Sequence, residues 1–156
     1  MAFFTDYATL QTTIANYLAR SDLTATIPEF IRLAEDRLSR DLRIRQMLQI
    51  ATTTIDSTDG TVEIPADFLA MKDIHVSSSN PIQTVTFQSP SNFFRNTRAS
   101  TSGLPTFYTA LGSEFRFAPI GSATDTLQML YYVKPPYMSS TVSSNLWLAN
   151  TPDLLL

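Results

Sequence analysis

The sequence has no cysteine, a single histidine and only four glycines among its 156 residues. The lack of cysteine excludes disulfides, thiolate metal sites and a cysteine nucleophile. Gly60, Gly103, Gly112 and Gly121 are too far apart to form a phosphate-binding loop. His75 is not accompanied by a Gly-x-Ser-x-Gly motif that could present a serine nucleophile. The sequence therefore predicts no enzyme, no metal and no cofactor.

Charge is also scarce. Charged residues make up 16% of the chain and the net charge is −3, against roughly 25% charged residues in ordinary domains. This balance argues against a protein that wraps nucleic-acid phosphates. No window approaches the ~20 apolar residues of a membrane span, and the opening residues lack the basic region of a signal peptide. We expect a soluble intracellular protein without membrane contact, and its low surface charge suits a subunit covered by copies or partners.

One acidic pair permits an enzymatic interpretation. Glu63 and Asp67 flank Pro65-Ala66 near a predicted strand end, and two carboxylates are the catalytic groups of glycoside hydrolases. The ordinary alternative is that Asp67 caps a helix or turn.

Residues 26–45 form the most strongly patterned stretch. Thr26 and Glu29 have the spacing of a capping box, and Pro28 stands in the first turn. The following apolar residues recur every three or four positions, which predicts one buried stripe of an amphipathic helix: Ile27, Ile31, Ala34, Leu38 and Leu42.

The opposite side of this helix carries opposite charges at four-residue spacing, in the series Arg32–Asp36–Arg40 and Arg37–Asp41–Arg45. Two interpretations stay open. The charges can form an ordinary solvated face, or they can contact another chain, because arginine is favoured in interfaces. The interface candidates are Arg32, Asp36, Arg37, Arg40 and Asp41.

The whole chain predicts an α+β fold in one structural unit. Residues 1–46 are helical, 47–150 are β-rich, and 151–156 begin a further helix. A first helix over 7–18, starting after Thr5 or Asp6, should pack on the second as an antiparallel hairpin. Two β-hairpins are expected, 47–55 with 61–64 and 106–111 with 114–118. Further strands are expected at 72–76, 82–87 and 126–133, with Val85 and Phe87 facing inward. A short helix at 89–97 should be anchored by Phe93 and Phe94.

Two further segments are candidate contacts. The loop 98–104 is rich in small polar residues, so Ser100, Thr101 and Ser102 should meet a neighbouring subunit or tail protein. At the end of the chain, Thr151 and Pro152 read as a helix start. The three leucines that close the sequence should be covered, either by a partner or by a continuation of the chain: Leu154, Leu155 and Leu156.

The order of these segments resembles the head-to-tail adaptor family of short-tailed bacteriophages. The resemblance is carried by the first helix, Ser21-Asp22-Leu23, Ile27-Pro28-Glu29-Phe30-Ile31, Ala34-Glu35-Asp36-Arg37-Leu38, Leu42-Arg43-Ile44-Arg45, Ile64-Pro65-Ala66-Asp67-Phe68-Leu69, Gly103-Leu104-Pro105, Phe107-Tyr108, Phe117-Ala118-Pro119, Leu130-Tyr131-Tyr132, Trp147-Leu148 and Pro152-Asp153-Leu154. Family members usually continue beyond this last position, whereas this sequence stops at Leu156.

The resemblance implies a structural virion protein at the head–tail junction, assembled in the host cytoplasm. It implies a homo-oligomeric ring of twelve copies, bound to the portal protein above and to tail nozzle or fibre proteins below. Double-stranded DNA would pass through this ring without sequence-specific binding. The rival interpretations are a virion-associated cell-wall glycoside hydrolase and a non-viral α+β interaction module.

Overall fold

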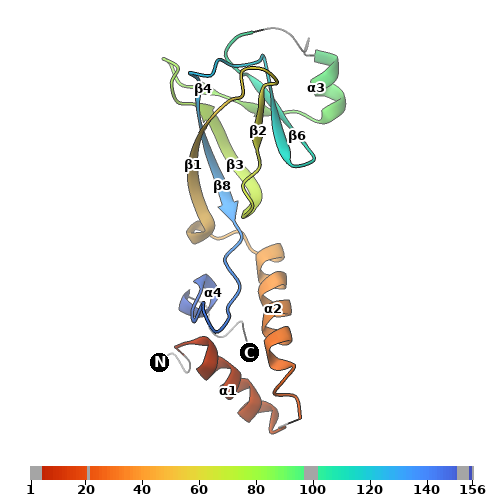
Figure 1. Cartoon of the computed structure of the whole chain (residues 1–156), viewed down its shortest axis with the longest axis vertical. Coiled ribbons are helices and arrows are strands. Elements are labelled where there is room, and N and C mark those ends of the chain that lie inside the picture. The colour runs from red at the N-terminus through yellow and green to blue at the C-terminus, as the bar shows by residue number, and fades with distance from the viewer. Residues whose placement is uncertain (1–4, 21, 97–101, 151–154, 156) are drawn as a thin grey trace. The chain divides into compact units, whose positions relative to one another are not determined.

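A computed structural model describes residues 5–20, 22–96, 102–150 and 155 of the chain. Over these residues the protein is a mixed α+β fold, as the sequence predicts, with two helices preceding the strands (Figure 1). The elements are α1 (Tyr7–Leu18), α2 (Ile27–Asp41), a 3₁₀ turn at Arg45–Met47, β1 (Leu48–Thr54), β2 (Thr61–Glu63), β3 (Phe68–Val76), β4 (Gln83–Thr84), β5 (Thr86–Phe87), α3 (Pro90–Asn96), β6 (Phe107–Leu111), β7 (Glu114–Ala118), β8 (Thr126–Val133) and α4 (Leu146–Asn150).

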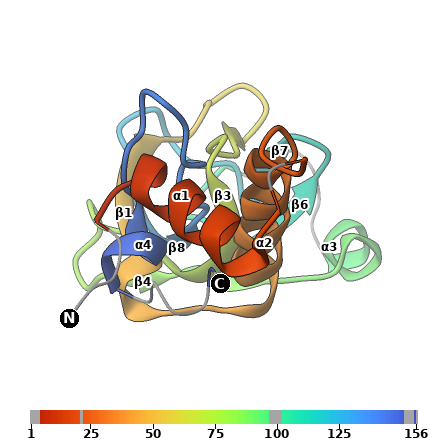
Figure 2. The ribbon, with the colours of Figure 1, turned by 90° about the horizontal axis from the view of Figure 1, so that it is seen from below.

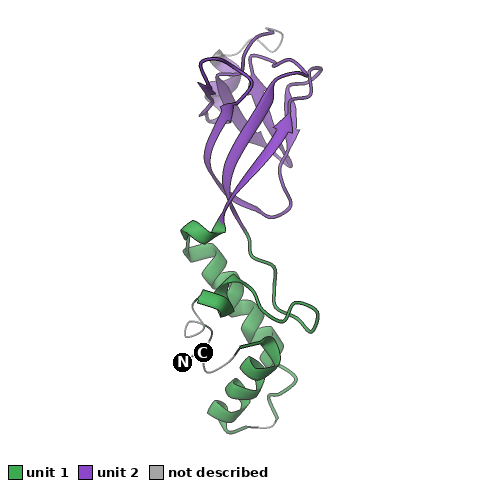
Figure 3. Cartoon of the chain, turned by 90° about the vertical axis from the view of Figure 1, so that its left-hand side faces the viewer, with its two compact units in different colours: residues 1–47, 134–156 green, residues 48–133 purple. Residues whose placement is uncertain are grey.

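The chain forms two compact units. Unit 1 comprises residues 1–47 and 134–156, and unit 2 comprises residues 48–133 (Figure 3). These bounds differ from the sequence-based ones, which placed 134–150 with the strands. In the structure residues 134–145 form neither helix nor strand, and 146–150 form α4. The consecutive prolines Pro135 and Pro136 lack the N–H groups that a ladder needs, so the last strand ends before them.

Unit 2 contains two four-stranded sheets, with strand orders β1-β8-β3-β4 and β2-β7-β6-β5. The paired strands are antiparallel except β5 and β6, which are parallel. β8 pairs with β1 along its length, from Leu48 opposite Tyr132 to Thr54 opposite Thr126. Side chains from both sheets form one buried cluster, so the core of this unit lies between the sheets.

Every second side chain of β7 and β8 contributes to this core. Phe115 and Phe117 of β7 are buried on one side, as the sequence predicts. Leu127, Met129 and Tyr131 of β8 are buried in the same manner. The predicted hairpin of β6 and β7 is confirmed by its register, from Phe107 opposite Ala118 to Leu111 opposite Glu114.

The other predicted hairpin, 47–55 with 61–64, is wrong. A turn is present, because the Gly60 N–H donates to the Asp56 carbonyl (2.8 Å) and the Asp56 N–H donates to the Thr61 carbonyl (3.1 Å). However, β1 pairs with β8 while β2 pairs with β7, so the chain passes from one sheet to the other at this corner. Gly60 suits the corner, since its φ is +69° and its carbonyl accepts a hydrogen bond from the Phe117 N–H.

The predicted strand 82–87 is interrupted. β4 pairs with β3 in one sheet and β5 pairs with β6 in the other, so only Val85 between them is buried as expected. Phe87 is exposed, contrary to prediction, because β5 is an edge strand. In α3, Phe93 is buried, whereas Phe94, its expected fellow anchor, is exposed.

Unit 1 begins with a well-capped helix. The Asp6 carboxylate accepts a hydrogen bond from the Thr9 N–H (2.8 Å), and Thr9 Oγ1 accepts one from the Asp6 N–H (3.1 Å), which completes a capping box. The capping box predicted for α2 is absent. The Thr26 hydroxyl donates instead to the Leu23 carbonyl (2.8 Å), inside the turn that precedes the helix.

The buried stripe of α2 is rotated from its predicted position. Ile27 and Ile31 are buried, but the next buried side chains are Glu35 and Ser39, while Ala34, Leu38 and Leu42 are only half-buried. Glu35 is buried because the segment after Lys134 supplies hydrogen-bond partners for it, described below. The Tyr7 N–H donates to the Ser143 carbonyl (2.7 Å), so the start of α1 also contacts this segment, just before α4 (Figure 2).

Candidate subunit interface

A buried carboxylate joins α2 to the C-terminal part of unit 1. The Glu35 side chain is 2% exposed, and its Oε1 accepts hydrogen bonds from the Met138 N–H (3.1 Å) and from Asn145 Nδ2 (2.5 Å). The other oxygen, Oε2, is buried without a hydrogen-bond partner among the described residues. Burial raises the pKa of Glu35, and the two hydrogen bonds oppose this shift only in part. Glu35 thus positions the segment that crosses α2.

Asn145 extends this connection into α4. Its Oδ1 accepts hydrogen bonds from the Trp147 N–H (3.1 Å) and the Leu148 N–H (3.2 Å), as a helix N-cap does. Its Nδ2 also donates to the Pro136 carbonyl (2.9 Å). The sequence analysis missed α4, although an asparagine before Leu146-Trp147-Leu148 was a usable helix-start signal.

Two of the predicted interface residues take part in a cluster within unit 1. Asp36 Oδ1 accepts hydrogen bonds from Lys134 Nζ (2.9 Å) and from the Tyr137 hydroxyl, and these two donors also contact each other. The Tyr137 bond first, and then the Lys134 bond, lower the pKa of Asp36. The Arg32 guanidinium stands 4.7 Å from the centre of the Tyr137 ring. No local sequence signal pointed to Lys134 or Tyr137, which lie about a hundred residues further along the chain.

The other charged candidates on α2 remain exposed. Arg37 Nε lies 3.8 Å from Asp41 Oδ2, with both side chains mostly in solvent, and an exposed ion pair of this kind contributes little to stability. Arg40 is also exposed. Arg43, which the sequence analysis did not select, donates from Nη1 to the Ser39 carbonyl (2.6 Å) and the Leu42 carbonyl (2.7 Å) at the end of α2.

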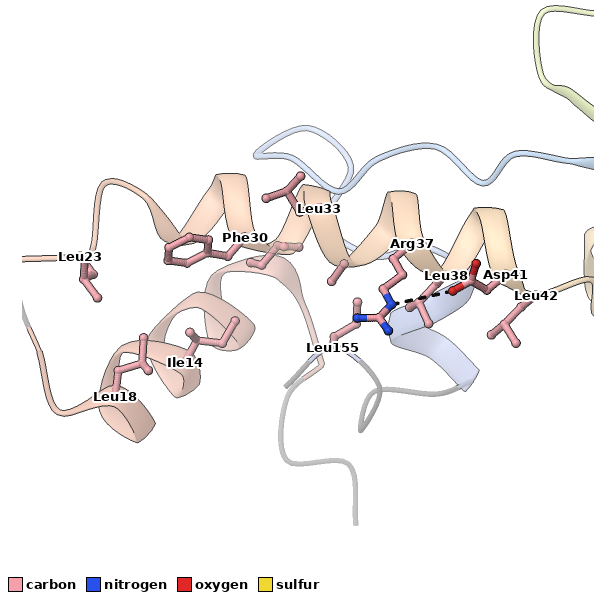
Figure 4. Close-up of a pocket in the computed structure, with 12 residues that line it drawn as sticks. Ile14, Leu18, Leu23, Phe30, Leu33, Arg37, Leu38, Asp41, Leu42 and Leu155 are labelled. Carbon is pink, nitrogen blue, oxygen red and sulfur yellow. Dashed lines mark ion pairs between the residues drawn. The ribbon is translucent and has the colours of Figure 1, made fainter.

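An open apolar groove of about 760 Å³ runs between α1 and α2 (Figure 4). Both helices turn apolar side chains toward it. Its lining comes from Ile14 and Leu18 of α1, Leu23, the α2 residues Phe30, Ile31, Leu33, Ala34 and Leu38, the following Leu42, and Leu155, with Arg37 and Asp41 beside them.

The remaining interface candidates are only partly covered by the structure. Leu155 is buried and lines the groove. Ser102 is exposed and forms an isolated parallel bridge with Ile120. Ser100, Thr101, Leu154 and Leu156 lie outside the described residues.

The residues that the sequence analysis considered for catalysis are Glu63, Asp67 and His75. Asp67 accepts a hydrogen bond from the Tyr131 hydroxyl (3.3 Å), and Glu63 is exposed on β2. His75 Nε2 lies 3.1 Å from Gln128 Oε1 on the paired strand β8, and its Nδ1 lies 3.5 Å from Asp73. Within the described ranges, no group of three or more His, Asp or Glu side chains is arranged to hold a metal ion. No helix in the described part of the chain is long and apolar enough to cross a membrane.

Comparison with known proteins gives one family. The model of the SU10 adaptor protein family matches residues 5–156, which covers both units. No curated protein matches the chain.

Proposed function

Because the chain belongs to the SU10 adaptor family, whose members are phage adaptor proteins, we propose that it forms a ring adaptor between the portal and the tail of a phage particle. The observation that carries this proposal is the family match over residues 5–156. The resemblance seen in the sequence adds the copy number, which we take as twelve.

In this role the protein extends the DNA channel below the portal protein and offers a platform to tail nozzle or fibre proteins. Its charge fits a passage through which DNA slides, because each additional phosphate contact would strengthen binding and slow the movement. A net charge of −3 provides few such contacts. We place the protein at the head–tail junction of the virion, after assembly in the host cytoplasm.

The exposed charged side of α2 is our first candidate for a contact between subunits. Arg37 and Arg40 are solvent-exposed, and the only ion pair found for either within the described residues is the long one to Asp41. The guanidinium group of arginine can form two parallel hydrogen bonds to one carboxylate, so these side chains suit a protein partner. Arg32 and Asp36 would support this face from the cluster that they form with Tyr137.

Ring formation is tested by co-expressing the full chain with the portal protein of the same phage and imaging the purified complex. We expect class averages with a ring of copies attached to the portal. The variant Arg37→Glu/Arg40→Glu should fold normally but lose ring assembly. Arg45→Glu/Lys72→Glu is the control, since it makes the same charge change at two exposed basic residues outside α2.

The two parts of the proposal fail separately. If the unaltered chain gives no ring with its portal and none in virions, the adaptor role is wrong. If rings form equally well with Arg37→Glu/Arg40→Glu, the role stands and the charged side of α2 is a solvated face.

We also propose that the role is structural and not catalytic. The Glu63 and Asp67 carboxylates occupy a strand and the turn after it, and Asp67 is bound by Tyr131. The test is a peptidoglycan zymogram of the purified chain beside lysozyme. A cleared band that disappears in Glu63→Gln would establish hydrolase activity.

A further inference from the structure

We propose that the apolar groove of unit 1 receives helix α3 of a second copy of the chain, with Phe94 as the central anchor. The inference rests on the proposed ring and deepens it, because it names the two surfaces that meet. It concerns contacts between copies, with the groove on one and α3 on the next.

Among the described residues, several apolar side chains of the groove remain exposed. Leu33 is 65% exposed, Phe30 is 48% exposed, and Leu18 of α1 on the other wall is 39% exposed. Figure 4 shows apolar side chains of α1 and α2 along the walls, with Leu155 between them. Large contiguous patches of exposed apolar surface usually mark interaction sites.

Unit 2 presents an apolar projection at the edge of its second sheet. Phe94 on α3 is 55% exposed, and Phe87 on the edge strand β5 is 59% exposed. Leu104, which precedes β6, is also exposed. α3 follows β5 directly and packs on β6, so the three side chains come from neighbouring segments (Figure 1).

Phe94 is held in place by its neighbour. Its ring meets the ring of the buried Phe93 edge to face, with centroids 5.6 Å apart. An aromatic side chain that is already ordered loses little conformational freedom on binding, and aromatic residues dominate the energetically important positions of interfaces. Phe94 therefore has the properties of an interface anchor that the groove of another copy can receive.

One ion pair can form between the two surfaces, although the groove is lined by one cation, Arg37, as well as by one carboxylate, Asp41. Arg95 on α3 is exposed, and the sequence has no carboxylate between Asp73 and Glu114. The groove carries the exposed carboxylate of Asp41, whose pair with Arg37 is long. Arg95, exposed beside Phe94, can pair with Asp41 of the receiving copy.

A second copy is the occupant that these observations favour. The groove and the projection are different surfaces of the same chain, and a contact between two different surfaces is heterologous. Repeated from copy to copy, a heterologous contact gives a closed ring when the rotation closes. The proposed adaptor needs such a contact, and these two surfaces provide both halves of it.

The absence of cysteine allows a cross-linking test without background. Leu33→Cys and Phe94→Cys are made in separate full-length chains, mixed, and assembled with the portal protein or at high concentration alone. A short bismaleimide should then give a heterodimer that contains one chain of each kind. Leu33→Cys mixed with Ile50→Cys is the matched control, because Ile50 is an equally exposed apolar residue of unit 2 away from α3.

Assembly defects supply the second measurement. Leu33→Asp places a charge in the apolar wall of the groove, and Phe94→Ser removes the anchor. Both positions are exposed, so folding should be retained. Each variant alone should weaken self-association about thirtyfold or more, as loss of an interface anchor does. Mixed together, the two variants retain one good contact per pair, so sedimentation should find dimers and nothing larger. Exchanging the charges in Arg95→Asp and Asp41→Arg should weaken assembly singly and restore it together.

The outcomes separate this inference from the function on which it rests. Rings that form normally with Leu33→Asp and Phe94→Ser, or assemblies that cross-link no better than the Ile50 control, would overturn the groove contact and leave the adaptor role intact. If the unaltered chain forms no assembly with itself or with the portal, both proposals fall together.

Discussion

Replacement of Glu35 by alanine should destabilise unit 1 more than any other change of a charged residue on α2. The substitution removes the acceptor of two hydrogen bonds, from the Met138 N–H and from Asn145 Nδ2. Asn145 keeps its bond to the Pro136 carbonyl, but the Met138 N–H loses its partner in a buried position.

The expected loss follows from these contacts. A buried donor left without an acceptor costs about 1–3 kcal/mol, and the lost bond from Asn145 to an ionised acceptor adds about 1.5–3 kcal/mol. Relief from burying a carboxylate with one unpartnered oxygen offsets part of this. A net loss of about 2–4 kcal/mol is therefore expected for Glu35→Ala. Glu35→Gln retains an acceptor of the same shape and should lose clearly less.

The assay uses the only tryptophan of the chain. Trp147 is 1% exposed and lies in the helix that Asn145 caps, so its fluorescence reports unfolding of unit 1. Urea titrations followed at this signal give the free energy of unfolding by linear extrapolation. Glu29→Ala is the control, since Glu29 is an exposed glutamate on the same helix.

The same experiment has a pH dependence of known sign. The pKa of Glu35 is raised by burial above its ordinary 4.5, so the folded state binds more protons than the unfolded state above that pH. Stability should consequently fall as pH rises from about 4.5 through the raised pKa, and Glu35→Gln should lack this contribution. A loss below about 0.5 kcal/mol for Glu35→Ala, or an equal loss for Glu35→Gln, would refute the hydrogen-bond account.

Three further predictions concern other parts of the fold. Tyr137→Phe removes the main cause of the lowered pKa of Asp36, so that pKa should rise in a carboxyl NMR titration. A carboxyl pKa that is lowered in the folded state stabilises the fold at pH values above the ordinary pKa of 3.8. As the pH is lowered, the variant should therefore begin to lose stability at a higher pH than the unaltered protein. Phe115→Ala in the core of unit 2 should cost about 3–5 kcal/mol in calorimetry; a cost below 1 kcal/mol would place this ring outside the core. Gly60→Ala should lower the melting temperature more than Gly112→Ala. Both glycines have positive φ, but an added Cβ at Gly60 would lie 3.2 Å from a backbone oxygen and at Gly112 would meet open space; equal effects would contradict this.

The elements that the sequence predicted well are those whose pattern is complete within a few residues. Phe115 and Phe117 of β7 and Leu127, Met129 and Tyr131 of β8 stand at every second position, so their burial followed from period two. The hairpin of β6 and β7 followed from the short turn between two apolar segments. The hairpin expected from the turn at Gly60 failed because a turn fixes only the local direction of the chain. The partner of β1 is β8, which lies more than seventy residues away in sequence.

The hydrophobic pattern could not predict which face of α2 is buried, for a related reason. Glu35 and Ser39 count as polar in any such pattern, so the pattern gives no reason to bury them. Glu35 is buried because Met138 and Asn145, about a hundred residues later, satisfy its carboxylate. The candidate site shares this limit, since the exposure of Arg37 and Arg40 followed from the pattern, whereas the cluster of Asp36 with Lys134 and Tyr137 did not.

The pairing of β1 with β8 has a consequence for how the chain could be rearranged. Leu48, where unit 2 starts, lies opposite Tyr132, one residue before unit 2 ends, so entry and exit are separated by about one strand spacing, roughly 5 Å. Such adjacent ends are the geometry of an inserted domain, which a host fold accommodates at a single surface position. Unit 2 can accordingly be removed at this position and replaced by a tight turn, or exchanged for another domain with neighbouring ends. Viral genomes that recombine could alter one half of the protein by the same route while the other half keeps its sequence.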